Sequence, residues 1–259
     1  MSRLIRYQHL VALHTILSKE IYRFMRIWPQ TVLPAAVTTS LYFLIFGTLI
    51  GQRIGPMAGI SYMDYLVPGV ALMSVITNAY SNVVSSFYSS KFQHNIEELI
   101  TAPVPNWVIL LGYAGGVARG LAVGAVVTGI GMYFANLSFL HPWVILAVFL
   151  VTSSLFALAG FINAVFANSF DDISIVPNFV LTPLVYLGGV FYSIDLLPEF
   201  WRKVSLGNPI LYMVNAFRYG FLGISDIPVL PALASIAGVV LLMAAWALWL
   251  LRRGTGLKN

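Results

Sequence analysis

The sequence predicts an all-α polytopic membrane protein, and three observations support this fold class. Apolar and aromatic residues make up 59% of the 259 residues, and only 9% are charged. A soluble domain carries about 25% charged residues, so this chain lacks the polar coat of a soluble surface. Uncharged stretches cover residues 27–52, 65–90, 99–118, 120–170, 173–194 and 227–251. The bilayer core takes roughly 20 apolar residues per helix, so each stretch is long enough to span it.

The same features exclude other classes. A transmembrane β-barrel needs segments of about ten residues with alternating polarity, and these stretches are too long and too uniformly apolar. No polar region is long enough for a separate soluble domain. The net charge of +5 does not indicate nucleic-acid binding, because the basic residues are scattered. The chain has no cysteine, so its composition does not indicate a redox compartment.

Six membrane-spanning helices are expected, because Asn136 and His141-Pro142 divide the longest uncharged stretch in two. The predicted spans are 30–50, 66–89, 107–134, 143–167, 173–192 and 229–251. Six spans place both termini on one side of the membrane. The basic residues on that side are Arg3, Arg6, Lys19, Arg23, Arg26, Lys91, Arg252, Arg253 and Lys258. Those on the other side are Arg53, Arg202, Lys203 and Arg218. The positive-inside rule therefore predicts cytoplasmic N- and C-termini.

Residues 1–28 are predicted to form an amphipathic helix at the membrane surface rather than a signal peptide. Charged residues between Lys19 and Arg26 interrupt the apolar core that a signal peptide needs. Apolar residues recur at helical spacing, at Leu10, Leu13, Leu17, Ile21 and Phe24. Lys19, Arg23 and Arg26 occupy another face, as in helices that lie among lipid headgroups. The helix is either a surface anchor alone or also a contact for a cytoplasmic partner.

The cytoplasmic loop 90–105 is predicted to contain a short helix. Ser90 followed by Gln93 is a capping-box pattern, and two prolines, Pro103 and Pro105, stop the helix. One side is apolar, at Phe92, Ile96, Leu99 and Ile100, and the other carries Gln93, Glu97 and Glu98. So short a helix needs packing to be stable. The membrane surface and a groove on another protein both remain open as its partner.

Four glycines recur at four-residue spacing within the third span, at Gly112, Gly116, Gly120 and Gly124. Such a ridge lets helix backbones approach closely in lipid, where the hydrophobic effect does not drive helices together. The pattern predicts that this helix lies inside a bundle or at a subunit interface.

Arg119 lies next to this ridge. An arginine at mid-bilayer costs about 2.5–3.5 kcal/mol on insertion scales, so it is expected to face a cavity, a partner or the interface. It is either a pathway or coupling residue, or a structural arginine that binds backbone carbonyls or a lipid phosphate.

Acidic residues, Asp171 and Asp172, precede the fifth span. Carboxylates there accept hydrogen bonds from free N–H groups and oppose the positive end of the helix. A proton or partner contact is the alternative role.

The external segment 193–228 is predicted to hold two short helices. Asp195 can cap the first, which contains Pro198 and ends near Gly207. Asn208 and Pro209 supply the cap and the first residue of the second. Both are apolar but too short to span the bilayer, so they are expected to be re-entrant or interfacial.

The sequence contains no pattern of catalytic, metal-binding or cofactor-binding residues. G-x-S-x-G and H-E-x-x-H are absent, and the four histidines are scattered. The phosphate-binding G-x-x-x-x-G-K-[ST] is also absent, so the chain does not bind ATP in that way. If transport is its role, its energy must come from a partner or from an ion gradient. A gradient-driven carrier would carry midplane charges and matching halves, which this chain does not visibly have, so a partner is favoured.

The sequence resembles the membrane subunit of ABC-2 type exporters, and is similar to small bacterial inner-membrane permeases of that family. The strongest motifs are Phe170-Asp171-Asp172-Ile173-Ser174, Pro177, Thr182-Pro183-Leu184, Tyr186 to Tyr192, Leu197-Pro198 and Asn208-Pro209. Supporting motifs are Arg23 to Arg26, Tyr42-Phe43, Phe46-Gly47, Asn95 to Leu99 with Pro103, and Gly115 to Gly120. The resemblance extends from about residue 18 to 223.

This resemblance implies that residues 1–259 form one transmembrane domain. It further implies a homodimer in the bacterial inner membrane, with two copies of a separate ATPase that binds ATP and Mg²⁺. The residues implied to contact the ATPase are Arg23, Arg26, Asn95, Glu97 and Glu98. Loop 90–105 would then carry the coupling helix, on a protein groove. The short external helices, with Pro198, Asn208 and Pro209, would close an outer gate, and the second and fifth spans would line the path.

The function expected from the resemblance is that of an exporter permease for an unidentified substrate, lipid-like, drug or glycan. A gradient-driven transporter or channel is the alternative. A membrane-embedded enzyme ranks lower, because no nucleophile and base, and no metal ligands, come together in the sequence.

Overall fold

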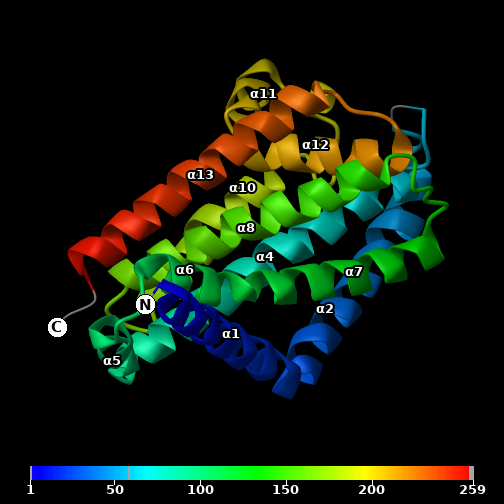
Figure 1. Ribbon diagram of the computed structural model, residues 1–259. Helices are drawn as coiled ribbons and strands as arrows, with labels where there is room; N and C mark the ends of the chain where they lie inside the picture. The colour runs from blue at the N-terminus through cyan, green and yellow to red at the C-terminus, as the bar shows by residue number, and fades with distance from the viewer. Residues whose placement is uncertain (1, 58, 257–259) are drawn as a thin grey trace.

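The computed structural model describes residues 2–57 and 59–256. Within these ranges the long helices form one bundle (Figure 1). Residues 1, 58 and 257–259, and with them Lys258, lie outside the described residues. The side chains of residues 2–6, which include Arg3 and Arg6, are likewise outside the description.

Helix α4 (Tyr62–Phe92) is the centre of the bundle. It packs against α7 (Val117–Phe134), α8 (Pro142–Phe166) and α12 (Pro209–Leu222). The backbones of α4 and α8 come very close at Gly160, where a Cβ atom would lie 2.6 Å from the carbonyl oxygen of Tyr80. Small residues at such contacts are typical of helix packing in membranes.

Five helices among the described residues are long and apolar enough to cross a bilayer. They are Trp28–Ile54, Tyr62–Phe92, Asn106–Phe134, Pro142–Phe166 and Val229–Arg253. The first combines α2 (Trp28–Tyr42), the π-helix η1 (Phe43–Ile50) and α3 (Gly51–Ile54). The third combines α6 (Asn106–Tyr113), the 3₁₀ turn η2 (Ala114–Gly116) and α7, and the last is α13 (Val229–Arg253). These helices agree with five of the six predicted spans.

The segment predicted as the fifth span, 173–192, forms a shorter apolar helix, Asp172–Tyr186. It consists of α9 (Asp172–Val176), the π-helix η3 (Pro177–Leu181) and α10 (Thr182–Tyr186). A proline ring has no N–H to donate, and the interruptions fall at Pro177 and just before Pro183. The helix ends before Gly189, whose φ of 70° turns the chain back.

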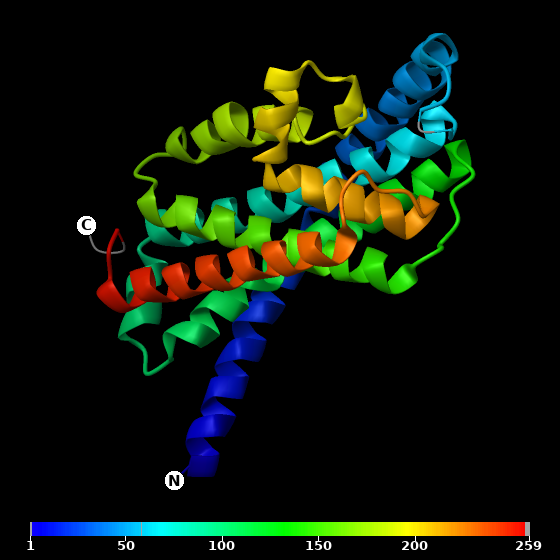
Figure 2. The same ribbon diagram turned by 90° about the horizontal axis from the view of Figure 1, so that it is seen from above.

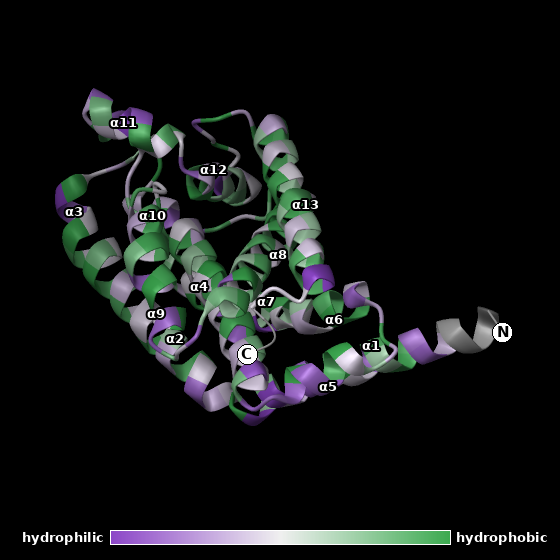
Figure 3. Cartoon of the chain, turned by 90° about the vertical axis from the view of Figure 1, so that its left-hand side faces the viewer, coloured by the Kyte–Doolittle hydropathy of each residue, from purple (hydrophilic) through white to green (hydrophobic). Residues whose placement is uncertain are grey.

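The outer helices expose large apolar side chains. Only 17% of the apolar stretch is buried in Trp28–Ile54 and in Val229–Arg253, against 78% in Tyr62–Phe92. Figure 3 shows hydrophobic residues along the length of the long helices and hydrophilic residues gathered toward α1, α5 and α11. This distribution suits a bundle whose middle part lies in hydrocarbon.

Helix α1 (Ser2–Arg26) projects from the bundle, and its N-terminal end lies far from the other helices (Figure 2). The predicted apolar face is wrong in part, because Leu10 and Ile21 are 62% and 44% exposed. The buried face instead contains Ile16, Glu20 and Phe24. The apolar residues alone did not identify the buried face, because a carboxylate occupies its centre.

Helix α5 (Asn95–Thr101) corresponds to the predicted short helix in loop 90–105. Its predicted start is wrong, because α4 continues to Phe92 and Ser90 lies inside it. The break comes at His94, which adopts a left-handed conformation with φ of 60°. The helix ends before the two prolines, and Ile96 anchors it in the core at 1% exposure.

The segment 193–228, predicted to be external, contains the 3₁₀ turn η4 (Ile194–Leu196), α11 (Glu199–Leu206) and α12. Asp195 does not cap α11 as predicted, because α11 begins after Pro198 and has no side-chain cap. At the start of η4 the Ser193 hydroxyl accepts from the Asp195 N–H. The Asp195 carboxylate instead pairs with Arg202 at 3.1 Å. Helix α11 ends at Gly207, and α12 begins after Asn208 with Pro209 in first position.

Candidate coupling and transport sites

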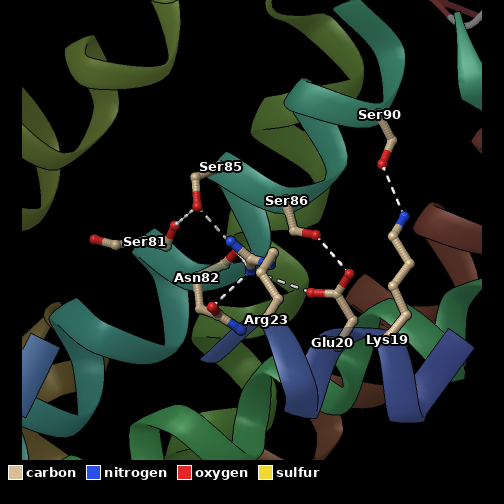
Figure 4. A network of polar contacts seen from close by, with 8 residues as sticks. All are labelled: Lys19, Glu20, Arg23, Ser81, Asn82, Ser85, Ser86 and Ser90. Carbon is tan, nitrogen blue, oxygen red and sulfur yellow. Dashed lines mark hydrogen bonds and ion pairs between the residues drawn. The ribbon is translucent and has the colours of Figure 1, made fainter. Parts of the chain in front are cut away.

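A buried polar network joins α1 to α4 (Figure 4). Its centre is Glu20, whose side chain is fully buried. The Ser86 hydroxyl donates to Glu20 Oε1 at 2.6 Å, and Arg23 Nη2 lies 3.1 Å from Glu20 Oε2. Arg23 Nη2 also donates to both oxygens of Asn82, at 2.9 Å to the carbonyl and 2.6 Å to Oδ1. A carboxylate can be buried only when it is paired and hydrogen-bonded, and this one is both.

Lys19 extends the network by one turn. Its Nζ atom donates to the Ser90 hydroxyl at 3.5 Å and lies 5.8 Å from the centre of the Tyr113 ring. Arg23 therefore faces the bundle, and Lys19, although exposed, extends toward α4; the sequence predicted that both face lipid headgroups. Arg26 is exposed at the end of α1.

Sequence analysis did not identify Glu20 as a site residue, although a signal was present. Ile16 and Phe24 lie four residues before and after it, so all three share one helix face. Both neighbours are buried. A carboxylate between two buried apolar residues at this spacing indicates a paired, buried charge.

The predicted ATPase-contact residues of α5 lie on its exposed side. Asn95, Glu97 and Glu98 are all exposed, and Glu97 pairs with His94 at 3.1 Å. They form an acidic surface at one end of the bundle, next to the end of α4 (Figure 1). The other two residues predicted to contact the ATPase, Arg23 and Arg26, lie on α1. Arg23 is not part of this acidic surface, because its side chain faces α4.

The glycine ridge of the third predicted span packs inside this chain. Gly112 faces Ile16 of α1, and Gly116 faces Val83 of α4. A Cβ atom at Gly120 would lie 2.8 Å from the Cβ atom of Ala79, and Gly124 faces Val75. The ridge thus lies against α1 and α4.

Arg119 lies on α7 beside this ridge and is partly exposed. No hydrogen bond or ion pair joins its guanidinium to any of the described residues, and its Nε atom is buried without a partner. The structure therefore does not support the carbonyl-binding role among the alternatives raised by the sequence.

Lys91 caps the C-terminal end of α8, which the sequence predicts to be cytoplasmic. Its buried Nζ atom donates to the carbonyl oxygens of Val165 and Ala167, at 2.9 and 2.7 Å. These carbonyls belong to the end of a helix, which carries partial negative charge, so a lysine there is favourable.

The acidic pair Asp171 and Asp172 lies at the connection between α8 and α9. Asp172 Oδ2 accepts from the N–H groups of Asn168 and Ser169, at 2.8 and 3.1 Å, and so fixes the turn between α8 and α9. The predicted hydrogen bonds to free N–H groups are present, but the donors precede the helix instead of opening it. Asp171 is exposed and its side chain caps nothing.

A cavity of about 280 Å³ lies between α4 and the helix Asp172–Tyr186. Its polar lining residues are Thr77, Tyr80, Ser81, Asn178, Thr182 and Tyr186. Its lining contains no charged residue. Thr77 and Ser81 are exposed and lie one turn apart on the side of α4 that no other described helix covers. The Thr77 hydroxyl donates to the Met73 and Ser74 carbonyls of its own helix, at 3.0 and 3.2 Å, so its oxygen remains free to accept a hydrogen bond on the cavity side.

Arg218 of α12 joins α4 to the turn after α10, at the end of the bundle opposite α5. It is 1% exposed and donates from Nη2 to the Gly189 carbonyl at 2.9 Å and from Nε to the Tyr65 carbonyl at 3.3 Å. Its guanidinium carbon lies 3.6 Å from the centre of the Tyr65 ring. The sequence placed Arg218 on the side of the membrane opposite the termini but did not predict that it is buried. Phe217 and Phe221, at helical spacing around it, mark the buried face.

Asn208 and Pro209 fix the start of α12. The Asn208 side chain accepts from the Ile210 N–H at 3.0 Å and donates to the Leu184 carbonyl of α10 at 2.6 Å. Pro198 is exposed and precedes α11. This arrangement links the two short external helices to the end of α10.

The helical bundle and its apolar outer surface define a multi-pass membrane protein. The chain belongs to the ABC-2 type transporter family, whose pattern it matches over residues 11–222. It is therefore a multi-pass membrane protein of the transporter permease class.

Two groups of relatives are informative. The inner membrane transport permease YadH of Escherichia coli strain K12 is 58% identical over 253 residues, covering 96% of this chain and 98% of YadH. Nodulation protein J of Rhizobium leguminosarum bv. viciae is 25% identical over 188 residues, covering 71% of each chain. Nodulation protein J of Rhizobium meliloti strain 1021 is also 25% identical over 188 residues, with the same coverage.

Proposed function

We propose that this chain is the membrane subunit of an ATP-driven exporter in a bacterial inner membrane. It works as a homodimer with two copies of a separate ATPase, which binds the ATP and Mg²⁺. Family membership and the missing phosphate-binding loop support this function. The observation that carries it furthest is the exposed acidic side of α5, at the end of the central helix α4.

The ATPase binds at α5 and at the nearby end of the bundle. Asn95, Glu97 and Glu98 offer exposed acceptors for a basic groove, and Ile96 anchors the helix to α4. Arg26 is a further contact on α1. Arg23 transmits movement instead of contacting the ATPase, because its guanidinium is already engaged with Glu20 and Asn82.

ATP-driven closure of the ATPase moves α5 and α1, and α4 follows both. Helix α5 acts on α4 through the short turn at His94. Helix α1 acts on α4 through the Glu20–Ser86 and Arg23–Asn82 hydrogen bonds. The glycine ridge transmits the movement to α7, because the side chains of α4 fill the grooves above Gly116 and Gly120.

The transport path runs along the exposed side of α4, past Thr77 and Ser81. The helix Asp172–Tyr186, together with the turn that follows it, serves as the fifth of six spans. A second copy of the chain covers the open side of the cavity. On this topology both termini are cytoplasmic, and Pro198, Asn208 and Pro209 belong to the external gate. The uncharged lining of the cavity fits a substrate without a net charge in its bound part.

The test is affinity purification of the tagged chain from native membranes in mild detergent, followed by mass spectrometry with stoichiometry. A P-loop ATPase is expected at one copy per permease chain. The amount of ATPase that co-purifies with the double variant Glu97→Lys, Glu98→Lys is expected to fall at least about tenfold relative to wild type. The reason is that like charges across an interface cost several kcal/mol.

The matched control is the pair Asp195→Lys and Glu199→Lys, two exposed acidic residues at the opposite end of the bundle. This control is expected to retain the ATPase fully. Recovery of the chain without any ATPase, under conditions that preserve other ABC complexes, would favour a gradient-driven transporter. Equal ATPase retention by both double variants would refute the α5 contact.

A further inference from the structure

Arg119 presents a guanidinium that nothing in the described chain satisfies. Its Nε atom is shielded from solvent and has no hydrogen-bond partner. The two terminal nitrogens are not hydrogen-bonded to any described residue either, and neither is among the shielded unpaired atoms, so both are accessible. A charged donor left unpaired in a membrane protein is costly, which indicates a partner from outside the chain.

The surroundings of Arg119 come from α1. A Cβ atom at Gly115 would contact Leu17 and Glu20. Arg119 follows Gly115 by four residues, and residues four apart share a helix face. Arg119 thus lies about one turn from Gly115, on the side of the third span that meets α1.

Arg23 also has donors to spare. Its Nη2 atom makes all the hydrogen bonds to Glu20 and Asn82. Its Nε atom is buried without a partner among the described residues. The Asn82 side chain that Arg23 binds also packs against Gly116, three residues before Arg119. Two arginines with unpaired donors therefore lie near one another where α1 meets α7.

The local charge balance is strongly positive. The cations are Lys19, Arg23, Arg26 and Arg119, and the carboxylate is Glu20. Both oxygens of Glu20 are already occupied, one by Ser86 and one by Arg23. The neighbouring helix α2 contains no charged residue, and Arg119 is the charged residue of α7. An additional anion is needed to balance this cluster.

We propose that Arg119 and Arg23 bind the phosphate group of an anionic phospholipid where α1, α2 and α7 meet. A phosphate offers several acceptor oxygens, and guanidinium groups bind such oxygens through parallel charge-assisted hydrogen bonds. The acyl chains lie along the apolar residues that α2 and α7 expose, of which Leu33, Val37 and Val126 are 54, 59 and 39% exposed. These residues favour a lipid over free phosphate. The site involves no ATPase, so it stands or falls independently of the proposed function.

The test uses the purified full-length chain in a neutral detergent. Native mass spectrometry records bound lipid after addition of phosphatidylglycerol, of phosphatidylcholine, or of inorganic phosphate, and thermal unfolding is measured in parallel. Wild type is expected to retain phosphatidylglycerol and to gain thermal stability from it, because a ligand that binds only the folded state raises its stability. Inorganic phosphate is expected to give no such gain.

Arg119→Gln is expected to reduce retained phosphatidylglycerol about tenfold or more, as loss of a charge-assisted hydrogen bond implies. Without lipid this variant should unfold at the wild-type temperature or above, because it loses a charge that has no partner. Arg119→Lys should restore part of the binding, since it keeps the charge but not the planar donor pair. Arg53→Gln, at an exposed arginine near the other end of the first span, is the control and should bind as wild type does.

Equal retention of phosphatidylglycerol by wild type and Arg119→Gln would overturn the proposal. Equal loss in Arg53→Gln would overturn it too, because binding would then follow net charge alone. A gain of stability from inorganic phosphate that depends on Arg119, without one from phosphatidylglycerol, would refute the lipid as the source of the phosphate.

Discussion

The Glu20 carboxylate and the Ser86 hydroxyl form a 2.6 Å hydrogen bond between residues that lie 66 positions apart in the chain. This bond fixes the projecting helix α1 to the central helix α4 by a buried charge. Together with the hydrogen bonds from Arg23 to Asn82 and the packing of Ile16 against Gly112, it holds α1 in its orientation.

Loss of this contact should destabilise the protein. Glu20→Leu leaves Arg23 and Ser86 without their shared partner and should cost about 1–3 kcal/mol, and Ser86→Ala less. Ser85→Ala is the control, because the Ser85 hydroxyl bonds only to backbone carbonyls of its own helix. Thermal unfolding in detergent measures all three. A variant Glu20→Leu as stable as Ser85→Ala would show that the network does not hold α1 in place.

The close approach of α7 to α4 should not tolerate a side chain at Gly120. Gly120→Val would force the β-carbon against the Cβ atom of Ala79 and the Val75 carbonyl, at 2.8 and 3.2 Å before relaxation. Overpacking of this kind costs about 1–3 kcal/mol. Gly129→Val is the matched control, since nothing lies within 4 Å of its Cβ position. Comparable unfolding temperatures for the two variants would contradict the packing described here.

Lys91 should matter for the end of α8. Lys91→Met keeps the length of the side chain but leaves the Val165 and Ala167 carbonyls without their donor, at a cost of about 1–3 kcal/mol. The expected result is a lower unfolding temperature and faster proteolysis within residues 166–172. Lys203→Met, which removes an exposed lysine from α11, should change neither measurement. Unchanged proteolysis in Lys91→Met would argue against a capping role.

Arg218 should fix the external turn at Gly189. Arg218→Lys retains the charge but lacks the planar guanidinium, so it cannot donate to the Gly189 and Tyr65 carbonyls at the same time. The loss is expected to be about 1–3 kcal/mol, because the remaining carbonyls are buried. Hydrogen exchange of residues 187–194 is the direct measurement and should become faster. Exchange that accelerates equally in α13 would instead indicate general destabilisation.

The cavity beside α4 should be open to water. The natural chain has no cysteine, so single substitutions give unambiguous labelling. Thr77→Cys and Ser81→Cys should react with a water-soluble maleimide, because the reactive thiolate forms only where water reaches the sulfur. Leu241→Cys, 71% exposed on α13 but surrounded by lipid, should remain unlabelled. Labelling of Leu241→Cys as fast as of Thr77→Cys would show that exposure alone explains the reaction.

Much of the fold follows from the sequence because membrane spans depend on simple length and polarity. Five spans, the short helix after α4 and the start of α12 at Asn208-Pro209 agree with what the residues predict. These features depend on local rules, namely uncharged length, helix capping and the rigid ring of proline.

The positions of buried charges could not be predicted in the same way. Sequence analysis assigned Glu20 no role and placed Arg218 only by its side of the membrane, yet both lie on helix faces that the tertiary structure buries. A charge is stable there only because distant partners, Ser86 for Glu20 and Gly189 for Arg218, supply hydrogen bonds. Those partners lie far away in the chain, so local periodicity does not reveal them.

The turn between α4 and α5 has a mechanical consequence. Only Gln93 and His94 separate the two helices, and both N–H groups bond back to the last turn of α4. This connection leaves little room for α5 to move independently of α4. A push on α5 therefore cannot be absorbed by a yielding linker and must turn the 31-residue helix behind it as a rigid lever. The far end of that lever, at Tyr62 and Tyr65, lies against the turn held by Arg218.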